Sequence, residues 1–280
     1  MKYIVLLFAC LTCIYAHAQG PLNFNKRLIE SENKWVAIKT AKDSLYGYGF
    51  VYLDVTAGLS AREGGTFKIT KEGAFIPTKN PSYQTRIIRL QGNPLIVAWI
   101  PIDKVKEMQE QEMPDWLKSY KADTTSTAWL FRKGVTYNAG NDMPKAFYYL
   151  DQVKKIDPKY PGLEFEYIYA YNALKQYDKA AAMIENALIT QPNNGDLYKE
   201  LVFARVNSNQ MGKAEETYKK GIDHCGINEK TEMAFNILYT YFAKKNKERF
   251  NYWANDIQTW LPATSPRAKD LTKMKEMLGQ

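Results

Sequence analysis

Imidazole and thiol groups, which many enzymes use as bases, nucleophiles or metal ligands, are scarce in this chain. Its 280 residues include two histidines and three cysteines. Cys10, Cys13 and His17 lie in an N-terminal segment that has the features of a removable leader, which leaves His224 and Cys225. Because adjacent side chains seldom point at each other, we interpret this pair as part of a turn. We expect no metal site built from several histidines or cysteines, and no cofactor.

Carboxylates are the remaining groups that could perform chemistry. General acid–base catalysis needs two of them at a defined separation, and the positions of Asp54 and Glu63 along the chain do not indicate one. The sequence also lacks a complete glycine-rich loop of the kind that binds phosphate groups. We therefore expect a protein that is not an enzyme.

The middle of the chain repeats with a period of 34 residues. The most regular positions hold Ala146, Ala180 and Ala214, each of which follows a lysine. Pro158 and Pro192 share the same spacing. A period of this length is typical of arrays of helical hairpins, which present binding surfaces and rarely perform catalysis.

The apolar pattern inside one unit explains why such units stack. After Ala146, apolar residues recur at Leu150, Val153 and Ile156, which is the spacing of one face of a helix. The proline of the period then ends this helix, because the residue before a proline avoids the helical conformation. A single hairpin cannot bury its apolar face, so neighbouring units must cover one another.

These residues resemble the tetratricopeptide repeat family, which favours a small residue and an aromatic in the first helix, alanine in the second, and a closing proline. The resemblance covers residues 127–262, with units at 127–160, 161–194 and 195–228 and a degraded fourth unit at 229–262 that fits only with a shift of two residues. Ile168 and Gly226 depart from the family pattern. The resemblance implies a superhelical array that binds a protein or peptide.

The resemblance also implies which residues face the partner, because one row of first-helix residues lines the concave face in this family. Here the row is mostly aromatic, so its rings would contact the side chains of a peptide while asparagine amides bind its backbone. The alternative is that the final helix of the same chain fills this groove. The predicted row consists of Phe131, Val135, Asn138, Phe165, Tyr169, Asn172, Lys199, Phe203, Asn207, Met233 and Ile237.

Residues 19–103 have a different pattern, in which short apolar runs alternate with turn residues. This predicts an antiparallel β meander, closed as a small barrel or folded as a sandwich. The expected fold class is therefore α+β with two domains. Residues 104–126 are predicted to form a helical linker, and residues 263–280 a helix that caps the array. The expected strands are residues 34–40, 45–54, 65–70, 74–78, 85–90 and 95–100.

One predicted strand carries four aromatic residues at every second position: Tyr46, Tyr48, Phe50 and Tyr52. Since side chains alternate along a strand, all four rings share one face. An exposed row could stack on sugar rings, which makes a glycan-binding module the alternative to a protein-binding one. A covered row would be ordinary core, or would pack against the helices.

The first 18 residues predict export. A short positive start precedes an apolar run at residues 3–15 and the sequence Ala16-His17-Ala18, which is typical of a signal peptide cleaved after Ala18. The alternatives are a retained anchor, for which the run falls short of ~20 residues, and a lipoprotein site at Cys10 or Cys13. We expect a periplasmic or secreted protein whose mature chain has no transmembrane span.

The formal net charge is +8. The lysine pairs lie near predicted helix ends, where they complement the helix dipole, so we expect no nucleic-acid partner. Together these features predict an exported, non-catalytic scaffold whose repeat array binds a protein or peptide partner in the cell envelope. The glycan-binding module remains the alternative.

Overall fold

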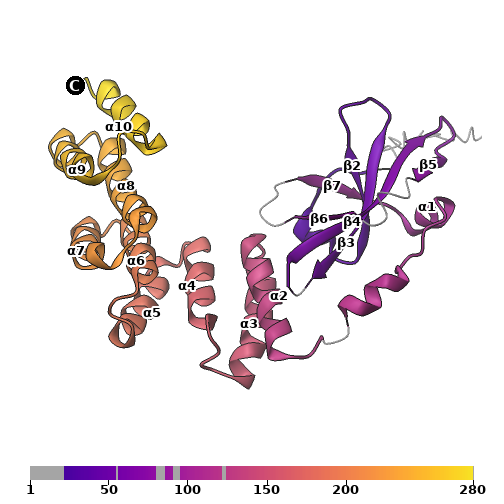
Figure 1. Cartoon of the computed structure of the whole chain (residues 1–280), viewed down its shortest axis with the longest axis horizontal. Coiled ribbons are helices and arrows are strands. Elements are labelled where there is room, and N and C mark those ends of the chain that lie inside the picture. The colour runs from indigo at the N-terminus through magenta and orange to yellow at the C-terminus, as the bar shows by residue number, and fades with distance from the viewer. Residues whose placement is uncertain (1–21, 55, 80–85, 91–94, 122–123, 280) are drawn as a thin grey trace, which may run out of the picture. The chain divides into compact units, whose positions relative to one another are not determined.

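The computed structural model describes residues 22–54, 56–79, 86–90, 95–121 and 124–279 (Figure 1), and the predicted leader lies outside them. The chain divides into two compact units, Met1–Tyr120 and Lys121–Gln280. The N-terminal unit contains an antiparallel sheet and the C-terminal unit is helical, so the predicted α+β layout with two domains is confirmed. Within the described part of the chain, no helix has the length and apolar character needed to cross a membrane.

The sheet of the N-terminal unit has seven strands in the order β1-β7-β2-β3-β4-β5, and β6 pairs with β4. Every pairing is antiparallel. The consecutive strands β2 to β5 form the predicted meander, and β7 returns to lie beside β2. The strands are β1 (Lys26–Arg27), β2 (Lys34–Lys39), β3 (Tyr46–Asp54), β4 (Gly58–Ile69), β5 (Phe75–Lys79), β6 (Ile87–Arg89) and β7 (Ile96–Trp99).

Strand β4 begins seven residues before the predicted strand at residue 65, because a tight turn joins it directly to β3. The carboxylate of Asp54 accepts hydrogen bonds from the backbone N–H groups of Thr56 and Ala57 at 2.9 and 3.2 Å. Gly58 then takes a φ of 75°, in the left-handed region that favours glycine. This turn lets β3 and β4 pair from Asp54 and Gly58 onward.

One face of the sheet is covered by the segment that we predicted to be a linker. Helix α1 (Ile102–Glu107) and the 3₁₀ helix η2 (Asp115–Tyr120) bury Val105, Met108 and Leu117 in the same core as the sheet residues. The side chain of Glu107 also accepts a hydrogen bond from the backbone N–H of Phe75 at 2.7 Å. Residues up to 120 are therefore part of the β unit, and the prediction of a linker over residues 104–126 was wrong for most of its length.

The helical unit is a series of helix pairs followed by one more helix (Figure 1). The second helices of the first three pairs begin 34 residues apart, and that of the fourth pair begins two residues later than this period, as the sequence indicates. The pairs are α2 (Thr127–Ala139) with α3 (Met143–Ile156), α4 (Leu163–Ala173) with α5 (Tyr177–Thr190), α6 (Gly195–Asn207) with α7 (Met211–Gly221), and α8 (Ile227–Ala243) with α9 (Lys247–Trp260).

Small residues allow the two helices of a pair to approach closely. Ala146, Ala180 and Ala214 are fully buried at equivalent positions. In the first pair, a Cβ atom placed on Gly134 would lie 2.5 Å from Cδ2 of Leu150 on α3, so only glycine fits there. A larger residue at these positions would overpack the contact, which typically costs about 1–3 kcal/mol.

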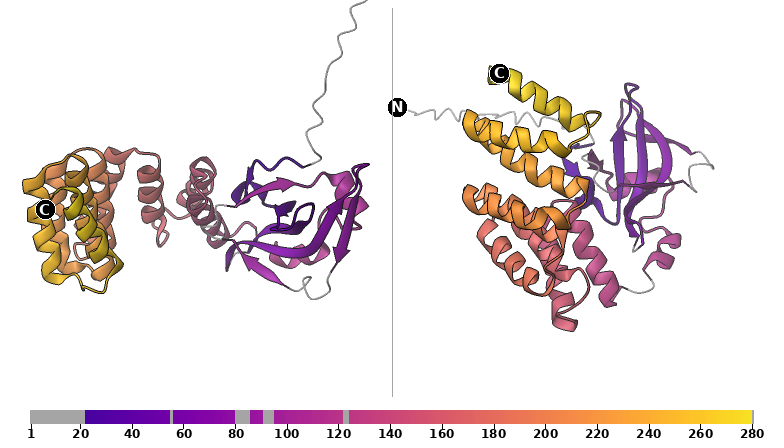
Figure 2. Two further views of the ribbon diagram at one scale, coloured as in Figure 1. Left: turned by 90° about the horizontal axis from the view of Figure 1, so that it is seen from above. Right: turned by 60° about the vertical axis from the view of Figure 1, so that its left-hand side comes forward.

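The last helix, α10 (Pro266–Met277), continues the stack instead of covering the first-helix row. Its Leu271 and Met274 are buried in the core formed with α8 and α9. The guanidinium of Arg267 lies 5.3 Å from the ring centroid of Phe235 and donates a hydrogen bond to the Tyr239 hydroxyl at 2.8 Å. Figure 1 and the right-hand view of Figure 2 show α10 at the end of the stack.

The turns inside the pairs also repeat. Asn141, Lys175, Asn209 and Lys245 take φ values of 57°, 60°, 61° and 52°. After each of them, the next backbone N–H bonds to a carbonyl of the last helical turn, as Gln176 does to the carbonyl of Tyr171 at 2.8 Å. This is the pattern of a helix end in which one residue adopts the left-handed conformation. Asparagine tolerates that conformation better than lysine does.

We therefore expect Lys175→Gly to stabilise the protein by about 0.5–1 kcal/mol, because glycine avoids the left-handed strain but loses more backbone entropy. The matched control is Ala182→Gly in the exposed middle of α5, which should destabilise by about 1 kcal/mol. Urea unfolding of both variants measures the effect. A loss of stability in Lys175→Gly would show that the lysine side chain is needed at this turn.

Candidate functional site

The predicted row begins on the first helices of the first three pairs, α2, α4 and α6. Phe131 and Val135 on α2, Phe165 on α4, and Lys199 and Phe203 on α6 are half-buried. Residues four apart share one face of a helix, so each helix contributes a short line of contacts.

Tyr169 is the most open aromatic group in this row. Its exposed fraction is 40%, and among the described residues its ring and its hydroxyl have no partner. It lies one helical turn after Phe165 on α4. Asn207 on α6 is exposed as well, although its amide donates to the carbonyl of Phe203 at 2.8 Å.

Four of the predicted row residues are buried, so the prediction was wrong for them. Met233 and Ile237 are fully buried in the core between α8 and α9. Asn138 and Asn172 are 1% and 5% exposed. All four point from a first helix into the stack, so a partner could reach them only if the units separated.

The two asparagines instead join neighbouring units. The Nδ2 atom of Asn138 on α2 donates to Oε2 of Glu166 on α4 at 2.8 Å and to its backbone carbonyl at 3.0 Å. One period later, Nδ2 of Asn172 donates to Oε2 of Glu200 on α6 at 2.9 Å. The repeat of glutamate at the same spacing was visible in the sequence, and it is the signal that would have identified these contacts.

These two carboxylates lie in an unfavourable environment. Burial raises the pKa of Glu166, and the hydrogen bond from Asn138 only partly opposes it. Burial likewise raises the pKa of Glu200, against the lowering effects of Asn172 and Lys199. In both pairs the asparagine Oδ1 atom is buried without a hydrogen-bond partner.

The end of the row near α6 and α8 is acidic. The ammonium of Lys199 lies 3.4 Å from a carboxylate oxygen of Asp196, 3.7 Å from Glu200 and 3.9 Å from Glu232. Of these acids, Asp196 lies in the first turn of its helix, where it also complements the helix dipole. The helices α4, α6 and α8 together carry more carboxylates than cations. The six carboxylates are Glu164, Glu166, Asp196, Glu200, Glu229 and Glu232, and the three cations are Lys199, Arg205 and Lys230.

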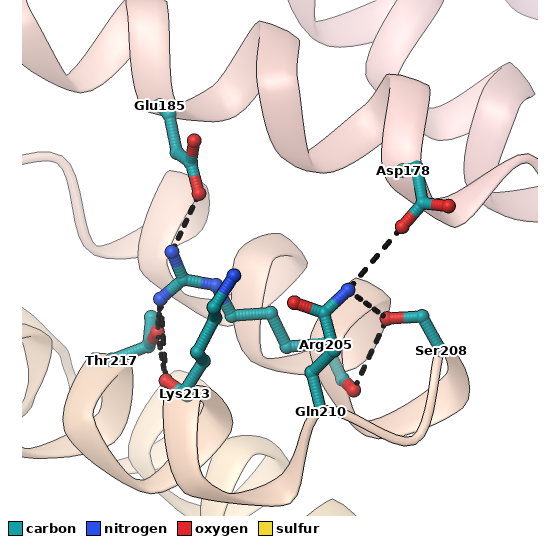
Figure 3. A network of polar contacts seen from close by, with 7 residues as sticks. All are labelled: Asp178, Glu185, Arg205, Ser208, Gln210, Lys213 and Thr217. Atoms are coloured by element: carbon teal, nitrogen blue, oxygen red, sulfur yellow. Dashed lines mark hydrogen bonds and ion pairs between the residues drawn. The ribbon is translucent and has the colours of Figure 1, made fainter.

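A polar network between α5, α6 and α7 contains the side chains that come nearest to a catalytic arrangement (Figure 3). Gln210 Nε2 donates to Asp178 Oδ1 at 3.3 Å and to Ser208 Oγ at 3.1 Å. The order of serine, glutamine and aspartate looks like a triad, but an amide cannot accept the proton of a hydroxyl as an imidazole does. The serine hydroxyl donates to the carbonyl of Arg205 at 3.3 Å instead.

The rest of this network holds helices together. Arg205, on α6, pairs with Glu185 of α5 at 2.6 Å, and it donates to the Thr217 hydroxyl and to the Lys213 carbonyl of α7 (Figure 3). Arg205 thus connects α6 to both of its neighbours, α5 and α7. We interpret the network as an interhelical clamp.

His224 and Cys225 take part in packing. The imidazole of His224 stacks on the ring of Tyr198 with centroids 5.8 Å apart. Burial raises the pKa of the Cys225 thiol to about 11, so it is neutral at physiological pH and a poor nucleophile. Among the described residues, no three His, Cys, Asp or Glu side chains come together as metal ligands would.

The aromatic row of β3 lies in the core of the N-terminal unit, so of the two alternatives that the sequence left open, the covered row is the one observed and the possible exposed surface is not. Tyr48, Phe50 and Tyr52 are buried, and Tyr46 is half-buried between Phe24 and Phe67. The cover comes from η2, where the rings of Trp116 and Tyr120 meet Tyr52 edge-on at 5.0 and 4.8 Å between centroids.

Comparison with known proteins does not assign a family. No protein-family model matches the chain, and no curated protein or solved structure is significantly similar to it.

The Asn172–Glu200 contact makes a testable prediction about stability and pH. Glu200→Gln keeps an acceptor for Asn172 Nδ2, removes the buried charge and adds a donor for Asn172 Oδ1, so it should stabilise the protein at pH 7 by about 1 kcal/mol. Because the pKa of Glu200 is raised on folding, the native glutamate costs stability as pH rises from its ordinary pKa of 4.5 through the raised value. The advantage of glutamine should therefore shrink towards pH 4.

The measurement is urea unfolding of native and variant proteins at pH 4 and pH 7. The control is Glu232→Gln, which removes an exposed carboxylate beside the same lysine and should change stability little. A Glu200→Gln variant that is less stable than the native protein at pH 7 would mean that the charge pairing with Lys199 outweighs burial.

Proposed function

We propose that the helical unit binds an extended segment of another protein along the row formed by α2, α4 and α6. The observation that carries this proposal is the uncovered part of the row, where Tyr169 has an open ring between the half-buried Phe165 and Phe203. Aromatic groups of this kind provide large contact areas at low entropic cost and are enriched in protein interfaces.

The surrounding charges support a partner of defined chemistry. Around Lys199, the carboxylates of Asp196, Glu200 and Glu232 outnumber the cation, although the chain as a whole is basic. A segment that presents apolar side chains to the rings and a lysine or arginine to the Asp196–Glu232 end would match both features. Complementary charge of this kind steers association and fixes the register of the bound segment.

We also propose that this binding occurs outside the cytoplasm. The predicted signal peptide supports an exported protein, so the partner would be a protein of the cell envelope. The absence of a catalytic arrangement among the described residues supports a scaffold that holds its partner, as the resemblance to tetratricopeptide repeat proteins implies.

Tyr169→Ala should weaken partner binding at least tenfold and change the melting temperature little, because the residue is 40% exposed. The matched control is Tyr148→Ala on the second helix α3, whose side chain is 63% exposed. A displayed library of random peptides, panned on the native protein, provides the probe. We expect selected peptides to combine apolar and basic residues.

Binding of these peptides to the two variants decides the proposal. Loss of binding in Tyr169→Ala together with retention in Tyr148→Ala supports the row as the interface. Equal binding to both variants, or a library that yields no consensus, argues against it.

A further inference from the structure

The N-terminal unit contains a cavity of about 370 Å³ that no part of the proposed function uses. It lies between strand β4 and the segment that follows α1. Its walls are residues 62–64 and 109–111, together with Trp35, Pro114 and Trp116. A volume of this size is at the lower end of the range found for small-molecule sites, so its ligand would be small.

A β-bulge shapes one wall of this cavity. Tyr48 pairs with Gly65 and Gly49 pairs with Glu63, which leaves Gly64 as an extra residue in β4. A Cβ atom at Gly64 would lie 2.2 Å from the ring of Tyr48, so the ring occupies the space that a side chain would need. Bulges redirect the neighbouring side chains and are frequent beside functional sites. Here the redirected residues, Arg62 and Glu63, both line the cavity.

Arg62 is the cation of the cavity, and no anion neutralises it. Its guanidinium lies 4.4 Å from the ring centroid of Trp116, a cation–π contact that holds the planar group in place. Its Nε atom is buried and has no hydrogen-bond partner. Among the residues that the structure describes, no carboxylate forms an ion pair with it.

The two acids of the cavity already have cations beside them. Glu110 lies 3.0 Å from the ammonium of Lys79 and accepts a hydrogen bond from the Tyr48 hydroxyl at 3.0 Å. Glu63 lies 3.6 Å from a guanidinium nitrogen of Arg86. That distance is too long for a hydrogen bond, so the buried Oε2 atom of Glu63 remains an acceptor without a donor.

A ligand for this cavity must therefore supply an anion to Arg62 and a hydrogen-bond donor to Glu63. We propose that the cavity binds a small hydroxy-carboxylate of the size of an acidic sugar. Its carboxylate would pair with the fork of Arg62, whose geometry suits a planar anion. Its hydroxyl group would donate to Glu63, and its carbon skeleton would lie against Trp35 and Pro114. This site is distinct from the buried aromatic row of β3.

Three probes separate the parts of this proposal, each titrated by calorimetry into the full-length mature chain. Galacturonate carries both the carboxylate and the hydroxyls, galactose carries only hydroxyls, and acetate carries only the carboxylate. We expect galacturonate to bind at least tenfold more tightly than either of the others. Equal binding of galactose or of acetate, or no binding of galacturonate at tens of millimolar, would overturn the proposal.

Substitutions of the cavity residues test whether galacturonate binds in the cavity. Arg62→Gln should weaken galacturonate binding about tenfold or more, and Glu63→Gln should weaken galacturonate but leave acetate unchanged. The matched control is Lys68→Gln, which removes an exposed cation from the same strand and should leave binding intact. If loss of the Trp116 contact unfolds Arg62→Gln, Arg62→Lys keeps the charge without the planar fork and should still bind more weakly. Unchanged affinity in a folded Arg62 variant sinks the assignment.

Discussion

A helix pair in this protein cannot cover its own apolar face, and the rest of the helical unit follows from that constraint. Each pair must lie against the next, and the contact has to satisfy any polar group that it buries. The first two junctions do so in part, with an asparagine and a glutamate from adjacent first helices, and the asparagine Oδ1 atom is left without a donor. At the third junction the equivalent positions hold Val206 and Ala234, which need no partner.

The third junction obtains its polar contact from the second helix α7, which meets both α8 and α9 there. The carboxylate of Glu215 on α7 accepts hydrogen bonds from the Tyr241 hydroxyl at 2.6 Å and from Trp253 Nε1 at 3.1 Å, and it pairs with Arg249. Burial raises the pKa of Glu215, but these three donors outweigh it, so the pKa is lower than usual. Glu166 and Glu200 have fewer donors, and there burial prevails.

The sequence predicted local features well and exposure poorly. The period located every second helix, because close packing at Ala146 and its equivalents requires a small residue whatever the surroundings. It could not show that Asn138 is buried, because an asparagine suits either a surface or a partnered core. The alternation at β3 likewise gave the shared face of the rings. Their cover, Trp116 and Tyr120, lies about 65 residues away, and only the tertiary structure brings it there.

Among the buried rings of β3, Tyr48 has a structural role at the cavity wall. Tyr48 cannot stack on a ligand, yet its ring supports the bulge at Gly64 and its hydroxyl holds Glu110 at the cavity wall. Burial and the neighbouring carboxylate of Glu110 raise the pKa of Tyr48 far above physiological pH, so the phenol keeps its proton and continues to donate. The donor of this contact therefore keeps its proton at neutral pH. What remains free to respond to a ligand is the guanidinium of Arg62.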